Sequence, residues 1–405
     1  MAAGVPASLL FSHTVLISCK AGRPGCFHIN SWIVKILQVV RQYFPGTGGM
    51  ETYVSSLCRE LQERGHRSDV ATLDYLFKSL EPLPPYQRVA GIDVIRLPSL
   101  GTARYFVAPR LLQLLPRYDL IHVHGVDFFI DLLGGGRRFH GKPVVLSTHG
   151  GFFHTAWFPS LKRAYFHTVT RMALRGVDRV IASSPRDEAM FAPVAPRLTL
   201  IANGIDFSRF SGLEKRIDDE ELLFIGRISK NKRVDRLIEM MATLRQTRPQ
   251  ARLTVVGPDW EGLRSGLEAR VAALGLEDGV TFTGELPHGQ MLERLSQARL
   301  FVTAAENEAF GLSAMEAMAS GTVPVLNDIE AFRGFVHSGE NGFLTDFATP
   351  AAAAGAVAAA LELPEGRLAE IGARAQATAS RYDWGQVAED IIELYRQVLA
   401  DHEDN

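Results

Sequence analysis

Short runs of β-branched and aliphatic residues alternate with stretches of helical periodicity along most of the chain, and this alternation limits the fold more than any other feature. The first strong strand is predicted over residues 34–40, and apolar residues then recur at helical spacing over 50–64. Further strands are predicted over 93–97, 119–123, 143–147, 179–182, 221–226, 252–257, 280–283, 299–303 and 323–327. The alternation predicts parallel sheets built from βαβ units.

The length of the chain favours two domains. It has 405 residues, whereas a domain typically contains about 100–200. A second series of strands begins near residue 221, so we predict two consecutive doubly wound α/β domains, the first over residues 34–205 and the second from Asp206. The alanine-rich stretch 351–360 is predicted to be a surface helix.

Residues 1–33 differ from the rest of the chain. Their apolar run, residues 9–18, has no basic residue ahead of it and is too short to span a bilayer, so it lacks the pattern of a signal peptide. We expect translation to begin at Val34 and residues 1–33 to be a disordered or non-native extension.

Composition and charge narrow the class of protein. With 46% apolar and 22% charged residues, the chain is neither disordered nor collagen-like. Cys19, Cys26 and Cys58 form no disulfide framework or metal knuckle, which favours a reducing compartment. The net charge of −2 hides +2 in residues 1–34, +8 in residues 35–205 and −12 in residues 206–405. The basic half suggests an anionic partner or surface, although drift of surface charge is an alternative.

Two motifs of the first domain can carry chemistry. Gly48 and Gly49 lie between the first strand and first helix, where glycine lets a ligand approach the backbone and the helix N-terminus attracts an anion. An ordinary turn is the alternative. His149 is followed by two glycines and comes directly after a buried strand, at the sheet edge where α/β proteins bind ligands. A capping histidine is the alternative there.

The second domain carries two more motifs. Arg227 and Lys232 follow its first strand and can converge on a diphosphate, although exposed basic residues are common. Glu308 precedes a predicted helix that contains Glu316, so one carboxylate can bind sugar hydroxyls and the other a ribose. Between them, Phe310, Gly311 and Leu312 place backbone N–H groups at the helix N-terminus, which suits a phosphate.

These four motifs, in this order, resemble the retaining glycosyltransferases of family 4, which adopt the GT-B fold of two Rossmann-like domains. The resemblance covers residues 34 to about 400 and implies a second domain over 206–383. It also implies that a last helix, within 384–405, crosses back onto the first domain. It implies catalytic roles for His149, Arg227, Lys232 and Glu308. Donor binding would fall to Gly48, Gly49, Phe310, Gly311, Leu312 and Glu316.

Residues 39–45, 121–129 and 147–156 are similar to the mannosyltransferases of xanthan- and acetan-type polysaccharide assembly. That similarity implies a hexosyltransferase that moves mannose from GDP-mannose to cellobiosyl-diphosphopolyprenol in an α-1,3 linkage. A UDP-sugar donor with another lipid-linked or soluble acceptor is the alternative. A non-catalytic scaffold subunit would tolerate losing Arg227 or Glu308, and both are present. A sugar-nucleotide 2-epimerase would share the glycine loops but would not need the spacing of Glu308 and Glu316. The sequence contains no Asp-x-Asp motif at a strand end, so we expect no cofactor and no required metal.

A lipid-linked acceptor implies a cytoplasmic enzyme that is peripheral on the inner face of the cell membrane. Residues 157–175 mix aromatic and aliphatic side chains with Lys162, Arg163, Arg171 and Arg175. Such a helix can lie in an anionic membrane interface, and a core-facing helix with a solvated basic edge is the alternative. Nucleic-acid binding is disfavoured, because no recognised binding module is present and one half is acidic.

Overall fold

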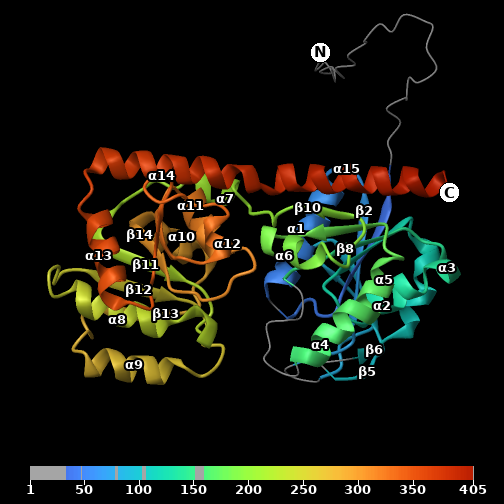
Figure 1. Cartoon of the computed structure of the whole chain (residues 1–405), viewed down its shortest axis with the longest axis horizontal. Coiled ribbons are helices and arrows are strands. Elements are labelled where there is room, and N and C mark those ends of the chain that lie inside the picture. Colours follow the sequence, from blue (N-terminus) through green and yellow to red (C-terminus); the bar gives the residue numbers. More distant parts are fainter. Residues whose placement is uncertain (1–32, 47, 78–80, 103–105, 151–158, 405) are drawn as a thin grey trace, which may run out of the picture. The chain divides into compact units, whose positions relative to one another are not determined.

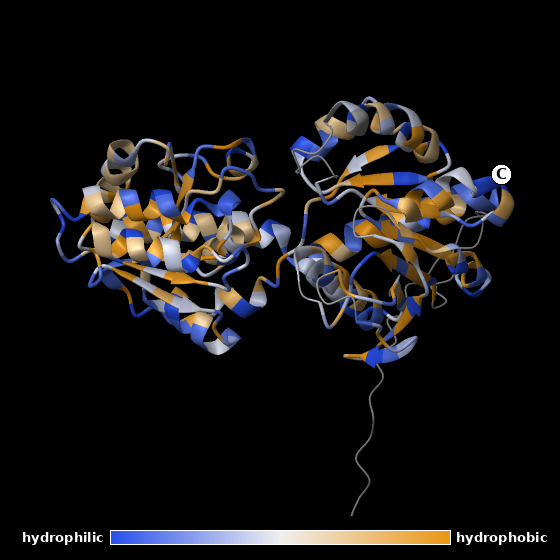
Figure 2. Ribbon diagram, turned by 90° about the horizontal axis from the view of Figure 1, so that it is seen from below, coloured by the Kyte–Doolittle hydropathy of each residue, from blue (hydrophilic) through white to orange (hydrophobic). Residues whose placement is uncertain are grey.

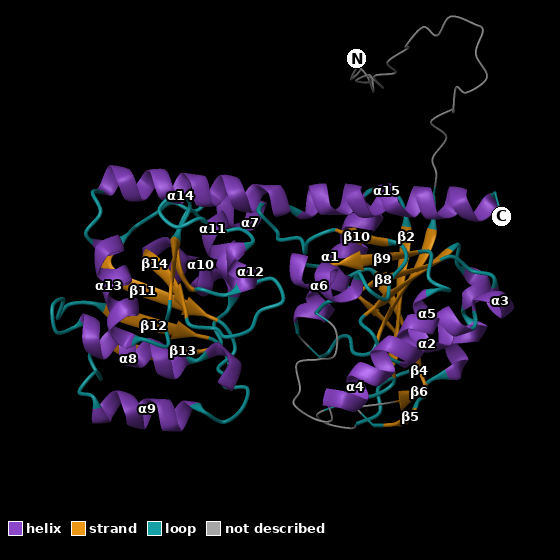
Figure 3. Cartoon of the chain, in the orientation of Figure 1, coloured by secondary structure: helices purple, strands orange, loops and turns teal. Residues whose placement is uncertain are grey.

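The chain folds around two parallel sheets (Figure 1). The computed structural model describes residues 33–46, 48–77, 81–102, 106–150 and 159–404, without the side chains of Pro159, Leu161 and Lys162. Apart from Ile33, the expected extension over 1–33 lies outside this range. Both sheets have helices on each face, which confirms the predicted doubly wound α/β architecture (Figure 3).

The first sheet has the strand order β10-β9-β8-β7-β1-β2-β4-β3, and all pairs are parallel except β3 with β4. Its strands are β1 (Lys35–Val40), β2 (Arg67–Leu73), β3 (Tyr86–Val89), β4 (Ile92–Leu97), β7 (Leu120–His124), β8 (Val144–Ser147), β9 (Arg179–Ala182) and β10 (Leu198–Leu200). A separate hairpin pairs β5 (Leu100–Gly101) with β6 (Phe106–Val107). In the register of the sheet, Val40 lies opposite His124, and His124 opposite Ser147, so β1, β7 and β8 end side by side.

Helices of several lengths connect these strands. They are α1 (Gly49–Glu63), two 3₁₀ turns (Pro109–Gln113 and Leu115–Arg117), α2 (Phe128–Gly135), α3 (Arg137–His140), α4 (Pro159–Tyr165), a π-helical turn (Phe166–Thr170), α5 (Arg171–Leu174) and α6 (Pro185–Phe191). The predicted basic helix is therefore an α–π–α segment. Its buried residues include Phe166 and Leu174, whereas Arg163, Arg171 and Arg175 are exposed.

The second sheet has the order β13-β12-β11-β14-β15-β16 and is parallel throughout. Its strands are β11 (Asp218–Ile225), β12 (Arg252–Val256), β13 (Val280–Gly284), β14 (Ala298–Thr303), β15 (Val323–Asn327) and β16 (Phe343–Thr345). Its helices are α7 (Ser208–Ser211), a 3₁₀ turn (Lys230–Lys232), α8 (Val234–Leu244), α9 (Arg264–Ala273), α10 (His288–Gln297), α11 (Leu312–Ala319), α12 (Glu330–Arg333), α13 (Pro350–Leu361) and α14 (Glu365–Ala379). A 3₁₀ turn (Ser380–Tyr382) and α15 (Trp384–Glu403) end the chain.

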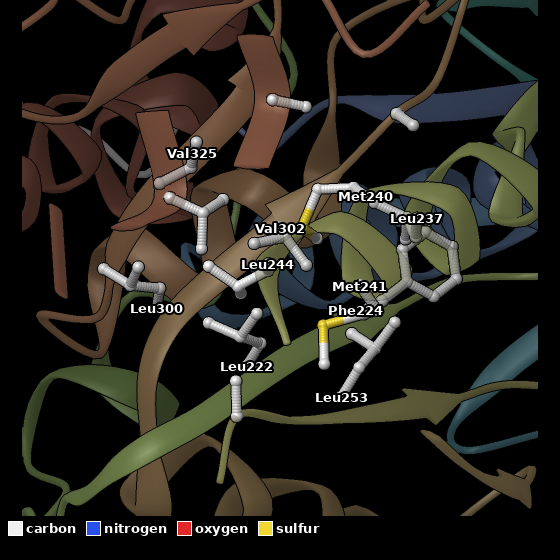
Figure 4. Close-up of a cluster of buried hydrophobic side chains, with 14 of the residues drawn as sticks. Leu222, Phe224, Leu237, Met240, Met241, Leu244, Leu253, Leu300, Val302 and Val325 are labelled. Carbon is white, nitrogen blue, oxygen red and sulfur yellow. The ribbon is translucent and has the colours of Figure 1, made fainter. Parts of the chain in front are cut away.

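Apolar side chains fill both faces of each sheet. Hydrophobic colouring accordingly runs along many of the strands (Figure 2). In the second sheet, Leu222 and Phe224 of β11 point to a cluster with α8, while Leu223 and Ile225 point to the opposite cluster (Figure 4). The expected alanine-rich surface helix is α13, and it is only partly a surface helix. Its residues Ala353, Val357 and Ala360 are buried in the α8 cluster, because alanine allows close helix packing.

The last helix, α15, packs on the first sheet. Its Tyr395 and Ile391 share a buried cluster with β1 and α1, and the ring of Trp384 lies 4.9 Å from that of Tyr53 on α1. Arg64 of α1 donates a 2.7 Å hydrogen bond to Glu389. The described helices include none that is long and apolar enough to cross a bilayer.

Candidate active site

The loop after β8 holds His149 in a restrained backbone conformation. His149 has a φ of +48°, in the left-handed region that side chains other than glycine rarely adopt. Asp187 at the start of α6 fixes the loop on both sides, because its Oδ2 accepts hydrogen bonds from Thr148 Oγ1 at 2.7 Å and Gly150 N at 2.8 Å. Ser183 Oγ donates to the same oxygen at 2.7 Å. Strain held by such bonds is typical of functional sites.

The imidazole of His149 lies against other rings of the first domain. Its Nε2 is 3.0 Å from Nδ1 of His124, and the ring of Tyr53 meets it edge-on with centroids 4.6 Å apart. Burial lowers the pKa of His149 to about 4, although the charge of Asp187 acts in the opposite direction. His149 is therefore neutral at physiological pH and binds other groups as an uncharged imidazole.

Gly48 and Gly49 lie where α1 begins. Gly48 is the N-cap and Gly49 the first helical residue, and a Cβ on Gly49 would meet no atom within 4 Å. The first turn also contains Glu51. Burial raises the pKa of Glu51, and the positive charges of Arg41 and Arg227 act against that rise.

Arg227 and Lys232 follow β11 in the second domain. The Arg227 guanidinium is exposed and lies 4.7 Å from the centroid of the Trp260 ring, a cation–π contact that orients it. Lys232 Nζ forms a partly buried ion pair with the carboxylate of Glu308. The fold thus brings together a cation and a carboxylate that are 76 residues apart in the sequence.

The loop that precedes Glu308 is tied to its surroundings by Asn231 and Arg186. Asn231 Nδ2 donates to the carbonyl of Asn307 at 2.7 Å, and the Asn231 carbonyl accepts from Glu306 N at 3.0 Å. Arg186 of α6 donates to Asn307 Oδ1 at 3.2 Å. Hydrogen bonds therefore join the loops of Lys232 and Glu308 to each other.

Gly311 caps the N-terminus of α11 in a conformation that requires glycine. Its φ is +94°, and a Cβ would lie 2.7 Å from Cε1 of Phe332. Phe310 is buried beside the ring of Tyr382, with centroids 5.3 Å apart, and Leu312 is the first helical residue. The first backbone N–H groups of α11 are therefore presented to an anion without intrahelical partners.

Glu316 lies one turn further along α11. Burial raises its pKa to about 7, and the positive charge of Arg209 acts against the rise. Half of these side chains are therefore protonated near neutral pH. A hydrogen-bond donor that reaches Glu316 favours its ionised form.

The remaining predicted residues lie apart from these loops. Arg163, Arg171 and Arg175 are exposed on α4, α5 and the turn that follows. The side chain of Lys162 lies outside the described part. Among the described residues, no group of three or more His, Cys, Asp or Glu is placed to hold a metal ion.

Four residues of the site were missed by sequence reasoning: Gln38, His124, Asp187 and Trp260. His124 and His122 were visible as two histidines within a buried strand, and this pattern is a usable signal. Gln38 forms a hydrogen bond with His124, and Asp187 forms one with Gly150. These partners lie far along the chain, so neither residue leaves a local sequence pattern. Trp260 was visible only as an aromatic residue just after a strand.

Comparison with known proteins places both halves of the chain in glycosyltransferase families. Residues 47–209 match the model of Glycosyltransferase Family 4, and residues 208–378 match that of Glycosyl transferases group 1. The chain is 35% identical over 374 residues to a GDP-mannose:cellobiosyl-diphosphopolyprenol alpha-mannosyltransferase of Xanthomonas campestris, which covers 90% of this chain and 97% of that protein. A protein of the same name from Komagataeibacter xylinus is 36% identical, covering 90% and 94%.

The solved structure of sucrose-phosphate synthase from Thermosynechococcus elongatus is similar in fold. Its TM-score is 0.71, with 24% sequence identity, and the match covers 91% of this chain and all of that chain.

Proposed function

This chain belongs to glycosyltransferase family 4, whose members adopt the GT-B fold, and we propose that it transfers mannose from GDP-mannose to a lipid-linked cellobiose. Two relatives with more than 30% identity carry that activity in their names. The observation that carries the proposal is the ion pair of Lys232 and Glu308 beside the N-terminus of α11. It places a cation for phosphate next to a carboxylate for sugar hydroxyls.

The donor diphosphate is bound by positive charge and by backbone N–H groups. The guanidinium of Arg227 binds the diphosphate through two N–H groups, and Lys232 supplies a second positive charge. The backbone N–H groups of Phe310, Gly311 and Leu312 donate further hydrogen bonds to it. Gly48 and Gly49 contribute from the first domain. These groups stabilise the charge that develops on GDP as it leaves, which is usually the largest catalytic effect in such sites.

The sugars are bound by carboxylates and by a neutral imidazole. When Lys232 turns to phosphate, Glu308 becomes free to accept hydrogen bonds from the mannose. Glu316 binds the ribose, and His149 meets a hydroxyl near the reacting carbon.

The transfer retains the configuration at mannose C1. The acceptor hydroxyl at position 3 attacks C1 on the face that the diphosphate leaves. The C1–phosphate bond breaks, the C1–O3 bond forms, and the hydroxyl proton passes to the departing phosphate oxygen. We further propose that no metal ion is needed, because Arg227 and Lys232 already supply two positive charges to the diphosphate.

A lipid-linked acceptor requires the enzyme to work at a membrane surface, and the first domain has features that support binding there. Residues 132–177 contain seven Lys or Arg and no Asp or Glu. Within this stretch, Phe139 is 94% exposed and Met172 is 69% exposed. We call Arg138, Phe139, Arg163, Arg171, Met172 and Arg175 the basic face. Exposed apolar side chains among arginines suit an anionic bilayer, so we propose peripheral binding to the inner face of the cell membrane.

A donor panel tests the proposed reaction. The purified full chain is incubated with cellobiosyl-diphospholipid and one GDP- or UDP-sugar at a time, and released nucleotide is measured. We expect turnover with GDP-mannose. Turnover with a UDP-sugar and none with GDP-mannose would refute the proposed donor, while leaving the fold and family unchanged.

A pair of lysine variants tests the site itself. Lys232→Ala should lower kcat at least a hundredfold, as loss of one charge-stabilising group typically does. Lys230→Ala is the matched control, since it removes an exposed lysine from the same 3₁₀ turn. It should stay within about twofold of wild type. Equal losses in both variants, or none in Lys232→Ala, would contradict the assignment.

A further inference from the structure

Polar side chains interrupt the apolar face of the first sheet that α1 and α15 cover. They occupy neighbouring strands and alternate with apolar residues that point to the other face. They are Gln38 on β1, Ser68 on β2, His122 and His124 on β7, and Ser147 on β8. Each is at most 1% exposed. Polar groups this deep need partners, and the identity of those partners determines where each proton lies.

The amide of Gln38 determines which groups donate and which accept in the hydrogen bonds among these polar side chains. Its Nε2 can only donate and lies 3.3 Å from Ser68 Oγ. Ser68 Oγ in turn donates a hydrogen bond to Cys58 Sγ at 3.3 Å. The other end of the amide, Oε1, can only accept, and it lies 2.8 Å from His124 Nε2. His124 therefore carries a proton on Nε2.

The proton on His124 determines which atom donates to it. Burial lowers the pKa of His124 well below its usual value, and repulsion from neighbouring His122 and His149 adds to the effect. A neutral imidazole protonated on Nε2 has a lone pair on Nδ1. The 3.0 Å contact between His124 Nδ1 and His149 Nε2 must then be donated by His149.

We propose that Gln38 and His124 are positioning residues that hold His149 as a neutral imidazole with its proton on Nε2. The lone pair of His149 then lies on Nδ1, and among the described residues Nδ1 has no hydrogen-bond partner. His149 consequently accepts a hydrogen bond from a substrate hydroxyl and donates none through Nδ1. The proposal rests on the proposed function in one respect only, namely that a sugar hydroxyl is the group that meets His149.

This assignment has a consequence for what His149 can bind. A phosphate oxygen without a proton offers only lone pairs, so it cannot pair with an unprotonated Nδ1. A sugar hydroxyl can donate to it. His149 therefore accepts a hydrogen bond from a hydroxyl of the donor or acceptor sugar, and the cations of the second domain bind the diphosphate.

The chain contains a matched control for this role on the same strand. His122 lies two residues before His124, points to the same face, and is equally buried at 0% exposure. Its ring nitrogens bind Tyr395 Oη at 2.6 Å and Ser147 Oγ at 2.8 Å, and neither bonds His149. A purely structural role would make substitutions of the two histidines equivalent.

Nitrogen NMR of the full chain, labelled at the histidine rings, tests the proposal without any substrate. The signals of His149 are assigned by their absence in His149→Gln. We expect Nε2 to give the signal of a protonated ring nitrogen and Nδ1 that of an unprotonated one. A proton on Nδ1, or on both nitrogens at neutral pH, would overturn the proposal even in the wild-type protein.

Variants connect the proton to the activity. His124→Phe removes the acceptor of the His149 hydrogen bond, so the His149 proton should redistribute between the two ring nitrogens. The value of kcat/KM should fall about tenfold to a hundredfold, which is the typical cost of losing a partner that orients a site residue. His124→Asn retains an acceptor oxygen and should restore part of the proton position on His149 and part of kcat/KM. His122→Phe should leave the His149 nitrogen signals as in wild type. An equal change of these signals in His122→Phe would show that the effect is structural and would overturn the proposal.

If GDP-mannose is not the donor, the nitrogen spectra still decide the proton position. Failure of the proposed function and failure of this inference are therefore distinguishable.

Discussion

At the scale of single residues, the site stores its charges in pairs. Lys232 and Glu308 neutralise each other. In the proposed reaction, the donor phosphate replaces Glu308 as the partner of Lys232, and the donor sugar replaces Lys232 as the partner of Glu308. Neither residue must then be desolvated alone, which is the costly way to bring a charge into a protein site. Glu316 follows a different rule, because burial keeps it partly protonated.

The raised pKa of Glu316 predicts a pH-dependent affinity for GDP. Ribose hydroxyls donate to the ionised carboxylate, so binding should favour proton release. Since the pKa is about 7, affinity should rise from pH 6 to pH 8 and fall about tenfold per pH unit well below the pKa. Calorimetric titration with GDP in buffers of different ionisation heat measures both the affinity and the released proton.

Two variants check this origin of the pH dependence. Glu316→Gln cannot ionise, so its affinity for GDP should be weaker at pH 8 and nearly independent of pH. Glu365→Gln changes an exposed glutamate on α14 and should retain the wild-type profile. The assignment fails if wild-type affinity is flat between pH 6 and pH 8, or if Glu316→Gln retains the slope.

At the scale of elements, the N-terminus of α11 depends on one glycine. Gly311→Ala should lower the free energy of unfolding by about 1–2 kcal/mol, because the left-handed conformation penalises a Cβ, and contact with Phe332 adds to the cost. It should also weaken GDP binding by displacing the phosphate-facing N–H groups. Gly355→Ala at an exposed position of α13 should instead raise stability by about 0.5–1 kcal/mol. Chemical denaturation of both variants tests the opposite signs.

Sequence reasoning predicted the strands that are mainly apolar and missed β2, in which buried polar residues come first. Residues 221–226 and 323–327 are apolar runs and were found as strands. The strand β2 begins with Arg67, Ser68 and Asp69 and was not predicted, because its polar side chains are buried by distant partners. Tyr118 donates to Asp69 at 2.8 Å, and Gln38 donates to Ser68. Such partners are known only after folding.

The candidate site divides in the same way. The glycines, cations and glutamates proposed to meet the donor stand in local motifs, so Gly311, Arg227 and Glu308 could be proposed from the sequence. Residues that fix a loop of the site, such as Asp187 beside His149, come from other elements and obey no spacing rule. The pairing of His124 with His149 spans 25 residues and follows from the adjacency of β7 and β8.

At the scale of the whole molecule, the near-neutral net charge of −2 is the sum of a basic first half and an acidic second half. The seven basic residues of 132–177, with no acidic residue among them, account for most of the excess of +8 in residues 35–205. A bilayer containing anionic lipid attracts the first half and repels the second. The charge distribution therefore favours contact through the basic face.

Vesicle binding separates the contribution of positive charge on the basic face from the contribution of its exposed apolar side chains. Arg163→Glu with Arg171→Glu should weaken binding to phosphatidylglycerol vesicles by at least about twentyfold, since each basic residue near the surface contributes about 1 kcal/mol. The loss should shrink at high salt, where charge is screened. Phe139→Ser should cost about tenfold at any salt concentration, because it removes an apolar side chain that can enter the interface.

Arg374→Glu provides the control, since it reverses one charge, half of the change made in the double variant, at an exposed position on α14 of the acidic half. If the basic face carries the contact, this variant should bind vesicles within about twofold of wild type, and phosphatidylcholine vesicles should bind weakly in every case. A loss of binding free energy in Arg374→Glu half as large as that in the double variant would mean that only net charge matters. Undiminished binding of the Arg163 and Arg171 double variant would mean that the enzyme reaches its lipid-linked acceptor through another surface.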